Sequence, residues 1–213
     1  MTRYRSQRRL LKVAMFAPIF AFGAVTLAVL AYPNFNHARQ YLSELGGAHA
    51  LHPAIFNTGV IVSGIGAALG GIGFGLTLLA LGGGRLAALV TALCFVLAGI
   101  GMVIASLFPW PDPRHLAINL GLGIQLAPLA LIWGLRTRPG LRGLRRFLGL
   151  VFVVMAILTI LTKHLIFKGL VNDFNVGWWE RAFAFVLVGW TGVAAFILER
   201  RLLALEREFP VSR

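Results

Sequence analysis

Six runs of apolar residues, each about twenty residues long, follow one another along this chain of 213 residues. Polar residues, glycines and prolines separate the runs. Because about twenty apolar residues in helical form cross the hydrocarbon core of a membrane, each run predicts a transmembrane helix. The expected helices are 13–32, 54–81, 86–108, 114–135, 147–167 and 180–199.

The composition agrees with this pattern and excludes a soluble globular protein. Hydrophobic residues make up 58% of the chain, charged residues 13%, and the mean hydropathy is +0.82. The connecting loops are too short for a soluble module. We therefore expect an all-α, polytopic membrane protein, a bundle of six transmembrane helices. Its parts are a basic N-terminus (1–12), a transmembrane domain (13–203) and a tail (204–213).

The distribution of basic residues predicts the orientation. The net charge is +13, with 20 lysines and arginines. If the N-terminus is cytoplasmic, fifteen of them face the cytoplasm and five the outside. This asymmetry favours cytoplasmic positions for both termini, in the cytoplasmic (inner) membrane. The arginines are scattered over separate loops without an aromatic surface, which argues against nucleic-acid binding.

The N-terminus also has the outline of a signal peptide. A basic segment precedes an apolar run, and Val29 and Ala31 are small enough for a cleavage site. The run is longer than the usual apolar region of such peptides, so a retained first helix is favoured. The one cysteine, Cys94, is expected to be a packing residue in mid-helix.

The segment 41–75 joins a polar stretch to a helix rich in small residues. Five small residues recur there at a spacing of four: Gly59, Ser63, Ala67, Gly71 and Gly75. We expect them on one helix face, where they let helices approach closely. The same face is a candidate surface for a homo-oligomer.

The turn before the fourth run has a clear local signal. Asp112 is a suitable N-cap and Pro113 a suitable first helical residue. This places His115 in the first turn, with Asn119 one turn deeper on the same face. A helix N-terminus disfavours a charged imidazole, so we expect a neutral His115 able to bind a metal or accept a proton.

Titratable residues gather on the expected outer side. All five histidines lie there: His37, His49, His52, His115 and His164. So do four of the seven acidic residues: Glu44, Asp112, Asp173 and Glu180. Any chemistry is therefore expected at the outer boundary of the membrane. Pro53 favours an extended His52, so His49 and His52 are not expected to form a rigid zinc-binding pair.

Short motifs in the first half of the chain resemble one family. They are Tyr41-Leu42-Ser43-Glu44-Leu45-Gly46, Phe56-Asn57-Thr58-Gly59, and Leu107-Phe108-Pro109 followed by Asp112 and His115. This pattern resembles the bacterial six-helix family called domain of unknown function nine-nine-eight, which is similar to the Frag/DRAM/Sfk membrane proteins. The resemblance implies six helices and an outward-facing end built from Ser43, Glu44, Asn57 and His115. Lipid is the first ligand class that it suggests.

Two functions use the same expected pocket. In the first, the protein binds membrane lipid or another amphiphile through polar groups at the outer end of the bundle. The expected ligand-binding residues are Asn57, Asn119, Lys163, His164, Asp173 and Glu180, together with Glu44 and His115. In the second, the protein is a membrane-embedded hydrolase or transferase, and its catalytic residues are His115, Glu44 and Ser43. Zinc or another divalent metal is a candidate cofactor, with His115, His164 and Glu44 as ligands.

Three further interpretations are less favoured. Haem with two histidine ligands needs a facing pair, and His115 and His164 form the one candidate. A transporter is expected to carry ionisable groups at the membrane midplane, where this chain has none. A purely structural role stays open.

Overall fold

The computed structural model describes residues 4–162 and 166–208, and this part of the chain contains helices and no strand. The α-helices are α1 (Arg5–Leu30), α2 (Pro53–Ala80), α3 (Arg85–Leu107), α4 (Ala127–Gly134), α5 (Arg142–Thr162) and α6 (Val176–Glu208). Three 3₁₀-helices accompany them: η1 (Leu42–Gly46), η2 (Pro113–Gln125) and η3 (Pro139–Leu141). Six segments are long and apolar enough to cross a membrane, with η2 and α4 forming the fourth and η3 and α5 the fifth. The predicted all-α class and the six spans are confirmed.

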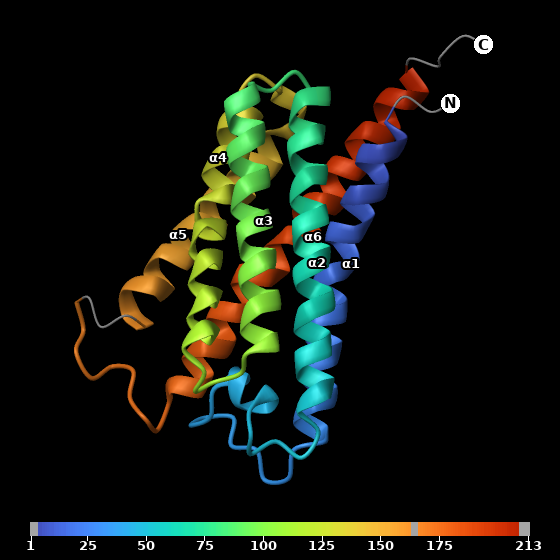
Figure 1. Ribbon diagram of the computed structural model, residues 1–213. Coiled ribbons are helices and arrows are strands. Elements are labelled where there is room, and N and C mark those ends of the chain that lie inside the picture. The colour runs from blue at the N-terminus through green and yellow to red at the C-terminus, as the bar shows by residue number, and fades with distance from the viewer. Residues whose placement is uncertain (1–3, 163–165, 209–213) are drawn as a thin grey trace.

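The helices pack in chain order, and α6 returns to α1 (Figure 1). Helices α1, α2 and α3 and the η2–α4 span lie side by side as a layer, and α6 crosses behind this layer on a diagonal. At about 1.5 Å per residue, the 33 residues of α6 extend over about 50 Å. When a helix is longer than the thickness of the hydrocarbon core, it tilts, and its apolar residues stay in lipid.

Both described chain ends lie at the same end of the bundle, here called the termini end. The opposite end, called the loop end, carries the loops 31–52 and 108–112, with η1 among them. The charge pattern also predicts that both termini lie on the same side of the membrane. The side of the membrane that they occupy stays a prediction.

The small residues of α2 contact different partners. A Cβ atom added to Gly59 would collide with Ala24 of α1, whereas one on Gly71 would collide with Phe95 of α3. Ser63 and Ala67, between them, line a cavity. The prediction of one shared face is therefore wrong. Four residues turn an α-helix by about 400°, so a spacing of four drifts by about 40° at each step. These contacts form within one chain, and the oligomer expected on this face stays a prediction.

The fourth span is not a continuous α-helix, as the prediction of 114–135 requires. Pro128 stands at the start of α4 and has no N–H to donate to the carbonyl group of Ile124, so the α-helical bond across this point cannot form. Residues Pro113–Gln125 before it are 3₁₀-helical, with about three residues per turn. His115 and Asn119 therefore do not stand one above the other; they are about 120° apart around η2.

Three helices begin or end well outside their predicted bounds: α5 begins at Arg142 rather than at 147, and α1 and α6 extend into the expected terminal segments. Helix α1 begins at Arg5 and α6 ends at Glu208, so parts of both expected terminal segments are helical. Arg8 explains this extension, since its guanidinium pairs with Glu199 and Glu206 of α6 at 2.8 Å each. Helix α6 also begins at Val176, earlier than predicted, which places Glu180 in its second turn.

The core fills the half of the bundle near the termini. Three aromatic rings meet where the core adjoins the half near the loop end: the ring centroids of Phe74 and Phe95 are 5.2 Å apart, and that of Trp190 lies 5.7 Å from that of Phe95. Fully buried leucines continue the core towards the termini end: Leu11, Leu78, Leu131, Leu135, Leu148, Leu198 and Leu202. Cys94 is partly buried and packs against this cluster, as predicted.

We predict that Gly75→Ala lowers the free energy of unfolding by about 1–3 kcal/mol, because the added methyl group overpacks a tight contact. An added Cβ would lie 2.8 Å from the carbonyl oxygen of Ala88 in α3. Thermal unfolding in detergent measures the change. The matched control is Gly149→Ala in α5, where nothing lies within 4 Å of the new atom. Equal stability of the two variants would contradict close packing of α2 on α3.

Candidate functional site

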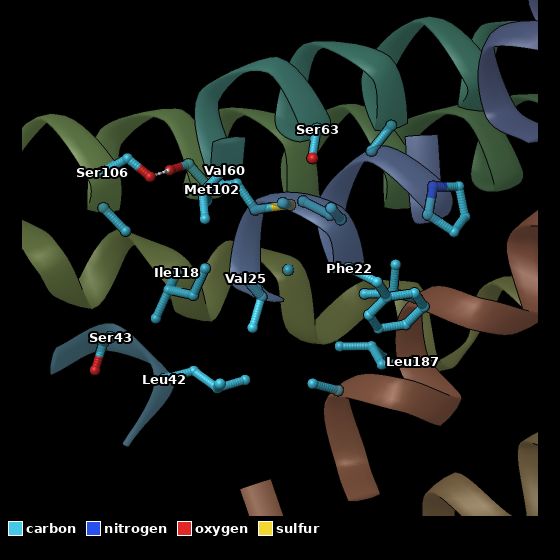
Figure 2. A pocket seen from close by; sticks show the side chains of 18 of the residues that line it. Phe22, Val25, Leu42, Ser43, Val60, Ser63, Met102, Ser106, Ile118 and Leu187 are labelled. Carbon is cyan, nitrogen blue, oxygen red and sulfur yellow. Dashed lines mark hydrogen bonds between the residues drawn. The ribbon is translucent and has the colours of Figure 1, made fainter. Parts of the chain in front are cut away.

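A cavity of about 800 Å³ occupies the half of the bundle near the loop end. Its walls come from α1, α2, α3, η2 and α6, and no residue of α5 lines it in the part of the chain that the structure describes. Figure 2 shows Val25, Val60, Met102 and Ile118 around this space, with Leu42 and Ser43 at one end. The lining residues of α1 run from Ala14 to Leu30, which corresponds to about 24 Å of helix.

The hydroxyl groups along the middle of the cavity are satisfied by their own helices. Ser63 donates to the carbonyl oxygen of Gly59 at 2.7 Å, and Ser106 donates to that of Met102 at 2.9 Å. Thr26 and Thr191 form similar bonds. A hydroxyl group bonded in this way has no free hydrogen to offer a ligand. Gln125, the amide that lines the cavity away from the loop end, accepts a hydrogen bond from Thr159 at 2.8 Å. The rest of the lining in the middle of the cavity is apolar and offers a ligand no free hydroxyl hydrogen.

Polar and charged residues are concentrated near the loop end of the cavity. The lining there contains His37, Ser43, Asn57, His115, Asn119, Glu180 and Arg181. Five of these were expected from the sequence as site residues: Ser43, Asn57, His115, Asn119 and Glu180. The structure thus brings residues from the loop, α2, η2 and α6 to one cavity.

His115 is held in a defined orientation. Its Nδ1 atom lies 2.9 Å from the carbonyl oxygen of Ala105 and 3.2 Å from that of Phe108. Since carbonyl oxygens can only accept, Nδ1 must carry the hydrogen. In the neutral ring Nε2 is then the free acceptor, as a base or a hydrogen-bond partner requires.

The cap that carries His115 is the predicted one. Asp112 accepts a hydrogen bond from the backbone N–H of Arg114 at 2.9 Å, and Pro113 takes the first helical position. The guanidinium of Arg114 also donates to the carboxylate, at 2.9 and 2.6 Å. These bonds lower the pKa of Asp112 from its usual 3.8 to about 2. The carboxylate therefore stays charged, and the cap stays in place, until the pH falls towards that value.

Glu44 has a structural role in the loop. One carboxylate oxygen accepts from the backbone N–H of Tyr41 at 2.7 Å, and the other accepts from the side-chain amide of Gln40 at 3.0 Å. The first bond belongs to the capping box of η1. Among the described residues that line the cavity, Glu44 is absent. Its catalytic and metal-binding roles gain no support from this geometry and stay predictions.

Ser43, Asn57 and Asn119 differ in how they are engaged. Asn57 donates to the carbonyl oxygen of Gly46 at 3.0 Å and so attaches η1 to α2. Ser43 and Asn119 line the cavity, and within the described part of the chain neither has a side-chain hydrogen bond to a protein group. No bond joins Ser43 to His115 among these residues, so the cavity holds a candidate base and a candidate nucleophile without a formed dyad.

The first turns of α6 hold the loop at the end of the cavity. The N–H of Gly177 donates to the carbonyl oxygen of Ala38 at 2.7 Å, and a carboxylate oxygen of Glu180 accepts from the N–H of Leu42 at 2.6 Å. Arg181 donates to the carbonyl oxygens of Gln40 and Gly177, at 3.0 and 2.7 Å. Gly177 is required because a Cβ atom there would meet the carbonyl oxygen of Gln40 at 2.7 Å.

His37 and Arg181 also line the cavity, and neither was among the site residues expected from the sequence. Arg181 counted only as one of the five basic residues on the expected outer side. The position of Arg181 directly after Glu180 was the available signal, because one helical turn can present both residues to the same region.

Three acidic residues act on the side chain of Tyr41. Burial raises the pKa of the Tyr41 hydroxyl group, and the carboxylates of Glu180, Asp173 and Glu44 raise it further. Asp173 is exposed and lies outside the cavity lining. The loop end therefore has a negative potential on this side.

The other expected site residues divide into two groups. Lys163 and His164 lie outside the described residues. His49 and His52 are exposed in the loop before α2, and His52 is non-helical before Pro53, as expected. The described residues contain no group of three metal-binding side chains. The expected metal site at His115, His164 and Glu44 includes His164, which lies outside the described residues, and so does the expected haem site between His115 and His164. Both sites stay predictions.

We predict that the neutral ring of His115 carries its hydrogen on Nδ1 rather than on Nε2, since two carbonyl oxygens hold Nδ1. Nitrogen-15 NMR of histidine-labelled protein distinguishes the two tautomers, and the signal that disappears in His115→Gln identifies the residue. His49 and His52 are exposed and supply the reference for an unconstrained ring. A proton on Nε2 of His115 would show that the orientation described above is wrong.

Comparison with known proteins gives a family without an assigned activity. The chain matches no curated protein and no solved structure. A family profile described as "Protein of unknown function (DUF998)" matches residues 15–197, which include every residue that lines the cavity except Ala14. This integral membrane protein of six spans therefore belongs to the DUF998 family.

Proposed function

We propose that the protein binds a lipid or another amphiphile, with the acyl chain in the cavity and the polar group at the loop end. The observation that carries the proposal is the division of the cavity into an apolar length and a polar end. An amphiphile has the same division. The volume of about 800 Å³ is within the range of about 300–1,000 Å³ of small-molecule sites.

Access from the membrane supports this proposal. Some lining residues remain largely exposed: Leu30 is 78% exposed, Phe185 67% and Leu122 49%. The cavity is therefore not sealed from its surroundings. The rings of Phe22 and Phe185 are 5.6 Å apart and bridge α1 and α6 beside the cavity. A chain entering sideways from the bilayer keeps its methylene groups out of water throughout.

The proposed orientation places the loop end on the outer side. Arginines crowd the termini end, among them Arg136, Arg138, Arg142 and Arg145, and basic residues prefer the cytoplasmic face. The ligand would then come from the outer leaflet of the cytoplasmic membrane. The arginines at the termini end are expected to contact anionic headgroups of the cytoplasmic leaflet.

The alternative is a membrane-embedded hydrolase or transferase that uses the same cavity. One observation favours it: His115 lines the cavity, and in its neutral form Nε2 is the free acceptor. In that reaction Nε2 would take a proton from Ser43 or from water while the bound amphiphile is attacked. Turnover of a bound ester that is lost in His115→Gln would support the alternative. Binding that is retained without turnover supports the binding function.

We predict that filling the cavity weakens amphiphile binding. Purified protein would be labelled with a lysophosphatidylcholine that carries a photoactivatable diazirine in its acyl chain. Val60 and Met102 both line the cavity, and tryptophan at both positions occupies space that the chain needs. Loss of the buried contact of even two methylene groups is worth about tenfold in affinity. We expect at least this decrease in labelling for the Val60→Trp, Met102→Trp double variant.

The matched control is Val62→Trp, which makes the same change in the same helix at a residue that is 44% exposed and outside the cavity. Its labelling should equal that of the unaltered protein. Mapping the labelled peptides by mass spectrometry supplies a second test. Labels found on the outer surface of α2, with equal yields in all variants, would disprove binding in the cavity.

A further inference from the structure

Two opposite charges lie side by side at the polar end of the cavity. Glu180 and Arg181 are consecutive residues of α6, and both line the cavity. In the part of the chain that the structure describes, no ion pair joins them, and neither pairs with another charged side chain. Each is therefore held at the end of an apolar space without a direct ion pair, although the two side chains and Glu44 act on one another electrostatically.

The backbone partners of both side chains leave hydrogen-bonding capacity unused. Glu180 has one bond, from the N–H of Leu42 to Oε2, so Oε1 is free of protein partners in the described residues. Arg181 uses Nη1 for the carbonyl oxygens of Gln40 and Gly177, while its buried Nη2 has no partner there. A buried donor without an acceptor is costly and indicates a missing group.

Unpaired charge next to an apolar cavity has to be compensated. Removing a charged group from water costs free energy unless an opposite charge replaces the lost hydration. Here the protein supplies a positive and a negative group one residue apart, which influence each other electrostatically but form no direct ion pair among the described residues. A ligand that carries both charges a few atoms apart compensates both groups, whereas an anionic ligand compensates Arg181 and is repelled by Glu180.

The neighbouring acids strengthen the preference for a cation beside Glu180. Glu44, Asp173 and Glu180 all act on Tyr41 at the loop end, and the first two lie outside the cavity lining. A purely anionic headgroup would meet this negative potential. A primary ammonium also donates hydrogen bonds, which the free Oε1 of Glu180 can accept.

We infer that the cavity selects a zwitterionic phospholipid of the ethanolamine type, with the phosphate on Arg181 and the primary ammonium on Glu180. This inference rests on the proposed function, since it names the headgroup of the amphiphile that the cavity binds. The guanidinium suits phosphate because its donors lie in one plane. The acyl chain extends from this end towards Phe95 and the closed part of the bundle.

The test compares headgroups on an identical acyl chain. Delipidated protein in detergent is titrated with lysophosphatidylethanolamine, lysophosphatidylglycerol and lysophosphatidylcholine, and native mass spectrometry measures the bound fraction. A single charged hydrogen bond gained or lost corresponds to about tenfold in affinity. We expect lysophosphatidylethanolamine to bind about tenfold tighter than lysophosphatidylglycerol, with lysophosphatidylcholine between them because its ammonium cannot donate.

Two variants assign the preference to the two residues. Glu180→Gln keeps an oxygen for the N–H of Leu42 but removes the charge, so it should bind the ethanolamine and glycerol lipids equally. Arg181→Gln removes the phosphate partner and should weaken all three lipids by about tenfold. The matched controls are Glu208→Gln and Arg200→Gln, exposed residues of the same helix at the termini end, which should behave like the unaltered protein.

The outcomes separate this inference from the function on which it rests. Tighter binding of lysophosphatidylglycerol, or no headgroup preference in the unaltered protein, overturns the inference while cavity binding stands. Absence of binding by every lysolipid overturns both. Free phosphoethanolamine, added as a competitor, should not displace the lysolipid at equal concentration, and displacement would overturn the role of the acyl chain. The headgroup series needs no variant, so it decides the question even if a substitution prevents folding.

Discussion

Close contact between helix backbones is the constraint on which this structure depends. In lipid, apolar side chains gain little from leaving their solvent, so helices associate through tight packing and hydrogen bonds. Helix α2 meets this need with glycines on two faces. Gly70 approaches Ala14 of α1 to 2.7 Å from its ideal Cβ position, and Gly75 approaches the carbonyl oxygen of Ala88 in α3 to 2.8 Å. The result is a set of neighbouring helices, α1, α2 and α3, that α6 crosses on a diagonal (Figure 1).

The cavity exists because α6 covers this layer unevenly. At the termini end Arg8 attaches α1 to Glu199 and Glu206, and the two helices pack closely there. At the loop end α6 is attached to the loop 37–42 instead, through Gly177, Glu180 and Arg181. Between these two attachments α6 crosses the layer on a diagonal (Figure 1). The space that results is closed on one side by aromatic rings and bounded on the other by a polar loop.

Charged groups in such a place are costly, which makes their retention informative. Glu180 and Arg181 have backbone partners that fix their positions and, in the part of the chain that the structure describes, form no direct ion pair. The same combination occurs in ligand sites, where the ligand completes the hydrogen bonding. His115 differs, because two carbonyl oxygens hold Nδ1 of its ring and leave Nε2 as the second, unused ring nitrogen. The cavity thus offers two charges for recognition and one unused ring nitrogen.

The sequence alone determined the class, the number of spans, the family and several local features. Apolar runs of about twenty residues have one stable form in a bilayer, so six helices followed directly. The cap at Asp112 and the non-helical His52 before Pro53 were also predictable, because both depend on neighbouring residues. His115, Asn57, Ser43 and Glu180 were correctly placed near one end, since topology fixes depth.

Only the tertiary structure decided which of these residues share a cavity. The depth of a side chain in the membrane follows from its residue number along the helix. The direction in which the side chain points depends on the tilt of the helix and on whether it is an α- or a 3₁₀-helix. The 3₁₀ geometry of η2 and the drift of the glycine spacing in α2 changed those directions. The sequence could not show that Glu44 would cap η1 while Arg181 would turn towards the cavity. The directions of these side chains depend on hydrogen bonds to backbone groups far away in the chain, the carbonyl oxygen of Gln40 and the N–H of Leu42. Every residue has such backbone groups, so the pattern of residue types does not show which of them will form a bond.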